Sequence, residues 1–248
     1  MRNLLILDNK IKSGDYEEWR NEDVKFWKKY SDVTPEYTII KRNLSFYPTY
    51  FDSDGDVRPT NTFLQTIVDE VVTTHGEFAF DFILLCVHED NWRSSGPIFD
   101  QLQRDSGINK KRGIWGTNYS YVFGSQNFQY CRWDKNNLAN VFGTLYHERT
   151  HSFDAITKVE TGVDIRLLLK VGNFDRAVVH GGTDPWEYIR YKENTEAIKR
   201  ISPHLRNAFR ARKAKHETNN QRKTLIDTLQ ELVYLYKKLI NRKNGVSL

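Results

Sequence analysis

The stretch that decides this fold is Leu145-Tyr-His-Glu-Arg-Thr-His-Ser-Phe-Asp154, which contains the spacing His147-Glu148-x-x-His151. On a helix, residues four apart lie on the same face, about one turn apart. Two imidazoles placed in this way can bind one zinc ion, and Glu148 lies beside them where a general base is needed. The spacing therefore predicts a zinc site with His147 and His151 as ligands and Glu148 as the catalytic base.

The residues around this motif predict a single helix from Asp134 to Phe153. An Asp or Asn can cap its start, and apolar residues follow at helical spacing: Leu138, Val141, Phe142, Leu145 and Phe153. Asp154 shares the face of the two histidines and can orient a ligand imidazole. The alternative is a solvated polar face with two ordinary histidines. The buried stripe favours the metal site, because a packed helix is the context that the motif requires.

Length and hydropathy place limits on the class of protein. The 248 residues suit one large domain, or one domain with an appendage. The longest apolar run, near Phe82–Val87, is far shorter than the roughly 20 residues of a membrane span, so no membrane partner is expected. The apolar run at Leu4–Leu7 is too short for a signal peptide and favours a buried first strand. We therefore expect a soluble, cytoplasmic protein.

The chain has only two cysteines, Cys86 and Cys131, and neither has a neighbouring cysteine at metal-ligand spacing. This excludes a zinc finger or a Cys-x-x-Cys redox motif. Cys86 lies in an apolar run and is expected to be a buried, inert thiol. A disulfide between the two cysteines stays open at this point, although nothing in the sequence requires one.

Charge is distributed unevenly along the chain. Residues 199–248 contain 13 Lys and Arg against three Asp and Glu, whereas the whole chain has 37 against 32, which leaves 24 against 29 in residues 1–198. An acidic body of about −5 thus carries a basic tail of about +10. The tail can contact nucleic acid, an acidic partner or the acidic body itself, and a simple solvated helix surface is an equally good interpretation.

The N-terminal half alternates between strand and helix patterns. We expect strands at Leu4–Leu7, Tyr37–Leu44 and Phe78–His88, with helices at Tyr16–Tyr30 and Pro59–Thr74. This alternation predicts parallel strands joined by right-handed βαβ crossovers. Residues 113–123 and 128–133 are aromatic and β-branched, and they predict paired or edge strands just before the motif helix. An extended peptide can add to such an edge, although an edge without a ligand is equally possible.

The C-terminal part predicts helices only. Thr183 or Asp184 can cap a helix that passes Glu187, Glu193 and Glu196 and ends before Pro203. A short basic helix is expected at Leu205–Lys215. Residues Thr224–Arg242 then form an amphipathic helix whose apolar stripe contains Leu225, Leu229, Leu232, Tyr236 and Leu239. This last helix is expected to pack on the body or on a second copy of the chain.

A catalytic zinc usually has three protein ligands, so the motif histidines need a third. The metzincin pattern would place a histidine six residues after His151, but Thr157 occupies that position. A carboxylate from another part of the chain is therefore needed. The acidic candidates are Asp154, Glu160, Asp164, Asp184, Glu187, Glu193 and Glu196.

Two segments together resemble a known family. His-Glu-x-x-His-x-x-Asp at 147–154, followed by Gly-Gly-Thr-Asp-Pro-Trp-Glu-Tyr at 181–188, resembles the gluzincin metallopeptidase domains of the anthrax lethal factor type. The resemblance implies an α+β, zincin-like mixed sheet with an active-site helix and a glutamate helix. It also implies Glu187 as the third ligand. Among the acidic candidates of this chain, Glu193, Glu196 and Asp184 come next. His180 stands where that family has a tyrosine that assists the oxyanion, so His180 is the expected second catalytic residue.

The resemblance covers about a tenth of the chain, and Tyr191 and Lys192 depart from the family pattern. We predict a zincin-like metallopeptidase domain at 1–202 and a basic helical extension at 203–248. The predicted function is zinc-dependent hydrolysis of peptide or protein substrates. The alternative is a non-catalytic zincin-like scaffold whose basic tail binds nucleic acid or an acidic partner. A third possibility is a peptidase that its own tail regulates.

Overall fold

The strands of this chain gather into one mainly parallel sheet. The computed structural model describes residues 1–44, 49–51, 57–88, 116–118, 127–133, 138–179 and 192–243. The main sheet has the order β2-β1-β5-β7-β6, in which only β6 is antiparallel to its neighbour. These strands are β1 (Arg2–Asp8), β2 (Glu36–Arg42), β5 (Phe82–His88), β6 (Gly116–Asn118) and β7 (Phe128–Trp133). A separate two-stranded sheet, which the sequence patterns did not indicate, consists of β3 (Thr49–Phe51) and β4 (Val57–Pro59).

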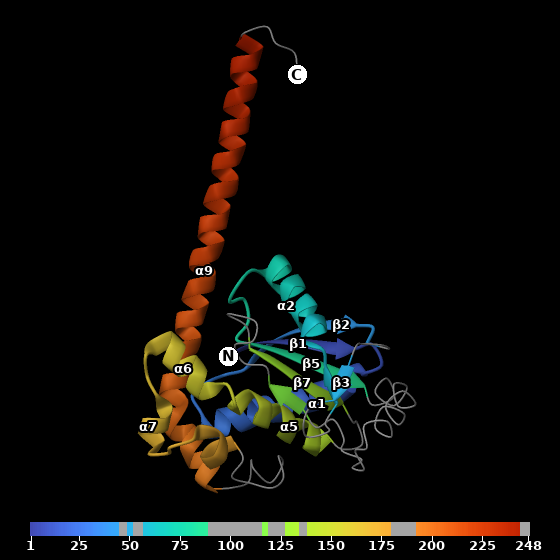
Figure 1. Ribbon diagram of the computed structural model, residues 1–248, viewed down its shortest axis with the longest axis vertical. Coiled ribbons are helices and arrows are strands. Elements are labelled where there is room, and N and C mark those ends of the chain that lie inside the picture. Colours follow the sequence, from blue (N-terminus) through green and yellow to red (C-terminus); the bar gives the residue numbers. More distant parts are fainter. Residues whose placement is uncertain are drawn as a thin grey trace.

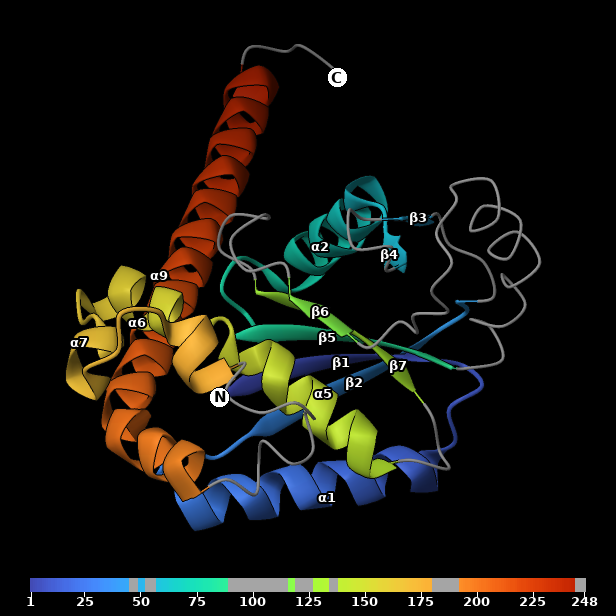
Figure 2. The same cartoon turned by 60° about the horizontal axis from the view of Figure 1, so that its bottom comes forward.

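Helices cover both faces of the main sheet (Figure 1). The helices are α1 (Ser13–Tyr30), α2 (Asn61–His75), α5 (Leu138–Thr150), α6 (Phe153–Thr161), α7 (Ile165–Leu169) and α9 (Lys192–Lys243), with a π-helical turn at Asp175–Val179. In Figure 2, α1 and α5 lie on one side of the strands and α2 lies on the other. The βαβ arrangement expected for the N-terminal half is confirmed, because β1 pairs in parallel with both β2 and β5.

The alternation of side chains along the strands produces two cores. In a strand, successive side chains point to opposite faces. Leu5 and Leu7 of β1 therefore join the core beneath α1, α5, α6 and α9, while Leu4 and Ile6 join the core beneath α2. All residues of β1 and β5 except their end residues Arg2 and His88 are buried. This explains why β5 reads as a continuous apolar run rather than as an alternating one.

Helix α9 differs from the expected set of separate helices. The sequence predicted a helix ending before Pro203, a second at Leu205–Lys215 and a third at Thr224–Arg242. The structure instead has one helix of 52 residues with Pro203 inside it. An internal proline removes a backbone hydrogen bond and costs about 3 kcal/mol. Burial of Ile198, Ile201 and Leu205 against the body offsets that cost.

The predicted boundary between domains at residues 202 and 203 falls inside this continuous helix. Leu205, Ala208 and Phe209 belong to the same core as α1 and α5, and Arg212 is also buried. The packed part of α9 therefore extends beyond residue 203. Residues 221–240, in contrast, are all exposed.

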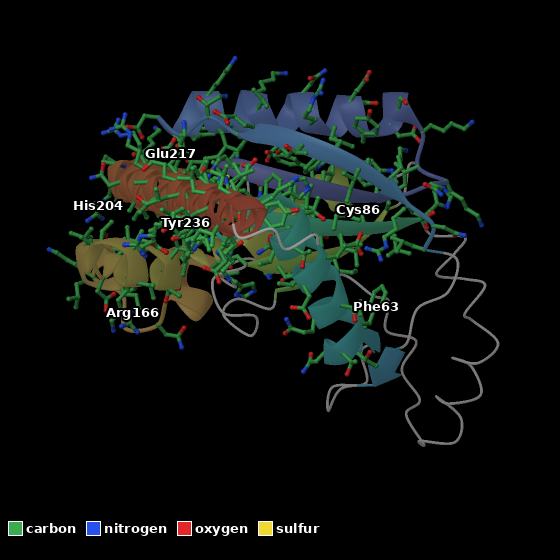
Figure 3. All side chains as sticks on the ribbon, turned by 90° about the horizontal axis from the view of Figure 1, so that it is seen from above. Phe63, Cys86, Arg166, His204, Glu217 and Tyr236 are labelled. Atoms are coloured by element: carbon green, nitrogen blue, oxygen red, sulfur yellow. The ribbon has the colours of Figure 1, made fainter. Side chains whose placement is uncertain are left out.

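The two cysteines are neighbours in the sheet but are not joined. Cys86 and Cys131 are register partners on β5 and β7, and both are free and fully buried. Cys86, labelled in Figure 3, lies on β5 between the layer of α1 and the layer of α2. Burial raises the pKa of the Cys86 thiol, because the thiolate would lose its hydration. This agrees with the expectation of an inert buried thiol.

Within the described ranges, no helix combines the length and the apolar character that crossing a membrane requires.

Asp32, just after α1, fixes the packed part of α9 to the body. Its backbone N–H donates to the Ser202 hydroxyl at 2.9 Å, and its carboxylate accepts a hydrogen bond from Ser202 and pairs with Arg206. The Ser202 hydroxyl, aided by Arg206, lowers the pKa of the Asp32 carboxyl. A lowered carboxyl pKa gives a stabilisation that is complete above the unfolded-state value, about 3.9, and is lost as the pH falls through the folded-state value.

We therefore expect Asp32→Asn to reduce the free energy of unfolding at neutral pH and to have a smaller effect in acid. Urea unfolding from about pH 7 to about pH 3 measures this difference. Asp227→Asn, on the exposed part of α9, is the control and should change stability by less than about 0.5 kcal/mol. An Asp32→Asn difference that is the same at every pH would contradict the assignment.

Candidate metal centre

Helix α5 and the turn after it leave the two motif histidines partly exposed and bury almost everything else. Between residues 141 and 153, every side chain is buried except His147 and His151. Val141, Phe142 and Leu145 enter the core beneath the sheet. A helix packed on nearly all sides holds its few accessible side chains in fixed positions. The pattern His147-Glu148-x-x-His151 therefore stands on a rigid support with its imidazoles at the surface.

The motif spans a helix end, which corrects the prediction of one helix over 134–153. Residues 134–137 lie outside the described ranges, α5 ends at Thr150, and α6 starts at Phe153. The His151 N–H still donates to the His147 carbonyl at 3.3 Å, but the Ser152 N–H donates to the Arg149 carbonyl at 3.1 Å. This tighter turn redirects the chain so that Phe153 and Ile156 of α6 enter the core.

The two imidazole rings meet at their Nε2 atoms. These atoms are 3.1 Å apart, and the ring planes are inclined by 79° with centroids 4.8 Å apart. Two nitrogens bound at about 2.0–2.1 Å to one tetrahedral zinc ion lie roughly 3.3 Å apart. The pair thus fits a shared zinc ion with little movement. The separation also suits a hydrogen bond from one ring to the other, so metal analysis must distinguish these two cases.

The two carboxylates of the motif region have different surroundings. Glu148 is only 7% exposed, although it follows His147 directly in the sequence. Asp154 is partly exposed in the first turn of α6, where its Oδ1 accepts a hydrogen bond from the Ala155 N–H at 2.8 Å. Glu148 is therefore held in place by its surroundings more firmly than Asp154.

Arg149, between the two histidines, is fully buried and fixes α5 to α1. Its Nη1 is 3.1 Å from Asp23 Oδ2, and its Nη2 also pairs with Oδ1 of Asp23. Both side chains are 0% exposed. Tyr37 on β2 donates its hydroxyl to Asp23, and Arg149 Nη1 also lies 3.5 Å from Asn3 Oδ1 on β1. The guanidinium therefore joins α5 to three elements directly beneath the histidine pair.

Burial and charge act in opposite directions on this network. Burial alone would lower the pKa of the Arg149 guanidinium, but the Asp23 carboxylate more than compensates, so the pKa is raised. Burial raises the pKa of the Tyr37 hydroxyl, and the Asp23 charge raises it further. Arg149 thus stays charged, and Tyr37 stays a hydrogen-bond donor, throughout the ordinary pH range.

Several candidate third ligands have other partners. Glu160 binds Arg212 at 3.1 Å and Lys215 at 2.6 Å, both on α9. Asp164 caps α7 and pairs with Arg166, which lowers the pKa of its carboxyl to about 2 through their hydrogen bond. Glu196 pairs with Lys199 at 2.6 Å on a half-exposed face of α9. These contacts make the three carboxylates poorer candidates.

The remaining candidates cannot be placed in the same way. Asp184, Glu187 and the expected oxyanion residue His180 lie outside the described residues, and of Glu193 only the backbone, in the first turn of α9, is described. Within the described ranges, no group of three or more His, Cys, Asp or Glu side chains could hold a metal ion. The prediction of Glu187 as the third ligand therefore stays a prediction.

The chain matches no protein-family model, no curated protein and no solved structure.

The motif spacing did not predict the buried ion pair of Arg149 and Asp23. The signal for it was present in two helices. In α1, Asp23 lies four residues from both Trp19 and Trp27, which are core residues, and in α5, Arg149 lies four residues after Leu145. An acid and a base that each occupy a core position of an apolar stripe indicate a buried ion pair, because a lone buried charge is very costly.

We expect Arg149→Met and Asp23→Asn each to lower the free energy of unfolding by about 3–5 kcal/mol, since each leaves an unpaired buried group. The double variant should lose clearly less than the sum of the two, because no buried charge remains. Denaturant unfolding of the four proteins measures this coupling. Additive losses would contradict a direct interaction between the two side chains.

Proposed function

We propose that this chain is a zinc-dependent peptidase whose metal ligands include His147 and His151. The observation that carries the proposal is the 3.1 Å separation of their Nε2 atoms on the only two accessible side chains between residues 141 and 153. The buried Arg149–Asp23 pair supports it, because rigid positioning from beneath is what a catalytic metal site needs. The order of strands and helices before α5 is compatible with the α+β class that the proposal needs.

The residues of the motif have separate roles in this proposal. The two imidazoles and a carboxylate would hold the zinc ion, which would supply an activated water and a polarised scissile carbonyl. Glu148 removes a proton from the attacking water and delivers it to the amine that leaves when the peptide bond breaks. Asp154 orients an imidazole. In the same proposal, Glu187 is the third ligand and His180 donates a hydrogen bond to the oxyanion.

The edge of the main sheet suggests where an extended substrate binds. Strand β6 is the terminal strand of that sheet within the described part of the chain, and it contacts α5. Its outer edge can pair with an extended peptide through backbone hydrogen bonds. A peptide bound along β6 would pass beside the helix that carries Glu148. This arrangement favours hydrolysis of peptides over zinc binding for structure alone.

Metal analysis is the first test. We expect one zinc per chain in the wild type and loss of zinc in His147→Ala and His151→Ala, because two ligands cannot hold the ion with high affinity. His204→Ala, a change on α9, is the matched control and should keep its zinc. Zinc kept in Glu187→Ala would move the third ligand to another acid, and no zinc in the reconstituted wild type would overturn the proposal.

Activity is tested with a different variant. Glu148→Gln should retain zinc and lose roughly 10²–10⁴-fold in cleavage of a peptide library read by mass spectrometry, since the amide cannot accept the proton. Glu217→Gln, on the exposed side of α9, makes the same chemical change and should leave cleavage unaltered. A wild type that binds zinc but cleaves no peptide, or a Glu148→Gln variant of full activity, would sink the assigned reaction.

A further inference from the structure

Helix α9 consists of a packed half and a free-standing half. Its last contacts with the body are near Gly76 and Glu77, where His216 Nδ1 lies 2.8 Å from the Glu77 carbonyl and Asn219 reaches the Glu77 carboxylate. From residue 221 to residue 240, every side chain is exposed. In Figure 1 this part of α9 rises beyond the sheet and its covering helices, with no other labelled element beside it.

The free-standing half has a continuous apolar stripe. At 100° per residue, eight large apolar side chains occupy one sector about 140° wide. They are Leu225, Ile226, Leu229, Leu232, Val233, Tyr236, Leu239 and Ile240, and each is between 39% and 66% exposed. The spacing of Leu225, Leu229, Leu232, Tyr236 and Leu239 alternates between four and three residues. This alternation is the heptad pattern of helices that pair with one another.

A stripe of this size indicates an interface. Single exposed apolar side chains are common, but a contiguous apolar patch of several hundred Å² usually marks a binding surface. Eight such side chains on each of two helices would bury on the order of 1,200 Å² in total, which reaches the lower end of stable protein interfaces. Figure 3 labels Tyr236 on this half of α9. The expectation that this helix packs on the body is not met among the described residues.

We propose that the free-standing half of α9 pairs with the same half of a second copy, in antiparallel orientation. In the pairing that matches the stripe, Leu229 of one copy packs beside Leu239 of the other, and Leu232 packs beside Tyr236. A second copy supplies an identical stripe, so Leu229, Leu232, Tyr236 and Leu239 each find an apolar partner.

Charge along the helix selects the antiparallel orientation. The acids Asp227 and Glu231 lie in the first half of the segment together with Arg222 and Lys223, whereas the charged residues of the second half are all bases: Lys237, Lys238, Arg242 and Lys243. Antiparallel pairing sets acids of one copy level with bases of the other, whereas parallel pairing sets like charges level. It also brings the basic end of each extension toward the acidic body of the other copy, since residues 1–198 have a net charge of about −5.

Arg222 gives a second reason for this orientation. It lies on the same face as the stripe, one heptad before Leu229. In a parallel pair, Arg222 of one copy would face Arg222 of the other at the centre of the interface, which is unfavourable. In the antiparallel pair, the two Arg222 side chains lie at opposite ends.

The mass of the full chain in solution tests the pairing. Sedimentation velocity at concentrations from about 1 to 100 μM should give twice the chain mass of 29.3 kDa for the wild type. Leu229→Glu/Leu232→Glu should give the monomer mass, because it places charges in the stripe. Thr224→Glu/Tyr234→Glu adds the same charge on the opposite face and should remain a dimer. Thermal unfolding of the three proteins checks that the body is folded in each.

Orientation is tested by cysteine crosslinking under mild oxidation. Leu229→Cys alone and Leu239→Cys alone should each form little covalent dimer, and a mixture of the two should crosslink, because residue 229 faces residue 239. Self-crosslinking of the single variants would overturn the antiparallel arrangement. The native Cys86 and Cys131 do not interfere, as both are fully buried.

A wild type that is monomeric at all concentrations would overturn the proposal and would indicate that something other than a second copy covers the stripe. A monomer that binds anionic lipid vesicles, with binding lost in Leu229→Glu/Leu232→Glu, would assign the stripe to a membrane surface. A monomer with strongly salt-dependent binding to duplex DNA would assign the segment to nucleic acid. Neither outcome affects the zinc and peptidase tests, whose site variants lie outside the free-standing half of α9.

Discussion

The buried pair of Arg149 and Asp23 is the interaction on which the rest of the site depends. Two charges that are both 0% exposed are tolerated only because each satisfies the other and because Tyr37 and Asn3 supply further hydrogen bonds. The contact fixes the rotation of α5 about its own axis. Since Arg149 must point into the core, His147 and His151 must point outward. One buried ion pair thus decides which face of the motif helix reaches solvent.

The turn after His151 is a second constraint on the same site. A longer straight helix would carry Phe153 away from the core that it shares with Trp27 and Phe82, its ring neighbours at 5.8 and 6.2 Å. The hydrogen bond from the Ser152 N–H to the Arg149 carbonyl turns the chain after α5. The His151 N–H still donates to the His147 carbonyl, as it would within a helix. The separation of the imidazoles is therefore determined by packing on both sides of them, which is the kind of preorganisation that metal binding requires.

Local patterns in the sequence predicted much of the fold. The apolar run at Phe82–Val87 and the alternation of strands and helices before it predicted β5 and the parallel pairing around β1. Residues 113–123 and 128–133 predicted paired or edge strands, and β6 and β7 form such a pair. The motif spacing alone predicted that His147 and His151 lie side by side. Local patterns failed where tertiary contacts decide the outcome. Pro203 indicates a helix end by propensity, and only the buried neighbours on α9 overrule it. The burial of Arg149 could not be predicted from α5 alone, because it depends on Asp23 of α1.

The uneven charge of the chain is explained by the two halves of α9. In the packed half, Arg212 is only 1% exposed and is neutralised by Asp81 at 3.3 Å and by Glu160 at 3.1 Å, so this part of the basic tail is matched by acids of the body. Arg206 meets Asp32 in the same way. Beyond Asn220 the helix no longer contacts those acids, although it has further basic residues and an apolar stripe. Covering that apolar face with a second copy would remove it from water and would add to the stability of this half of α9.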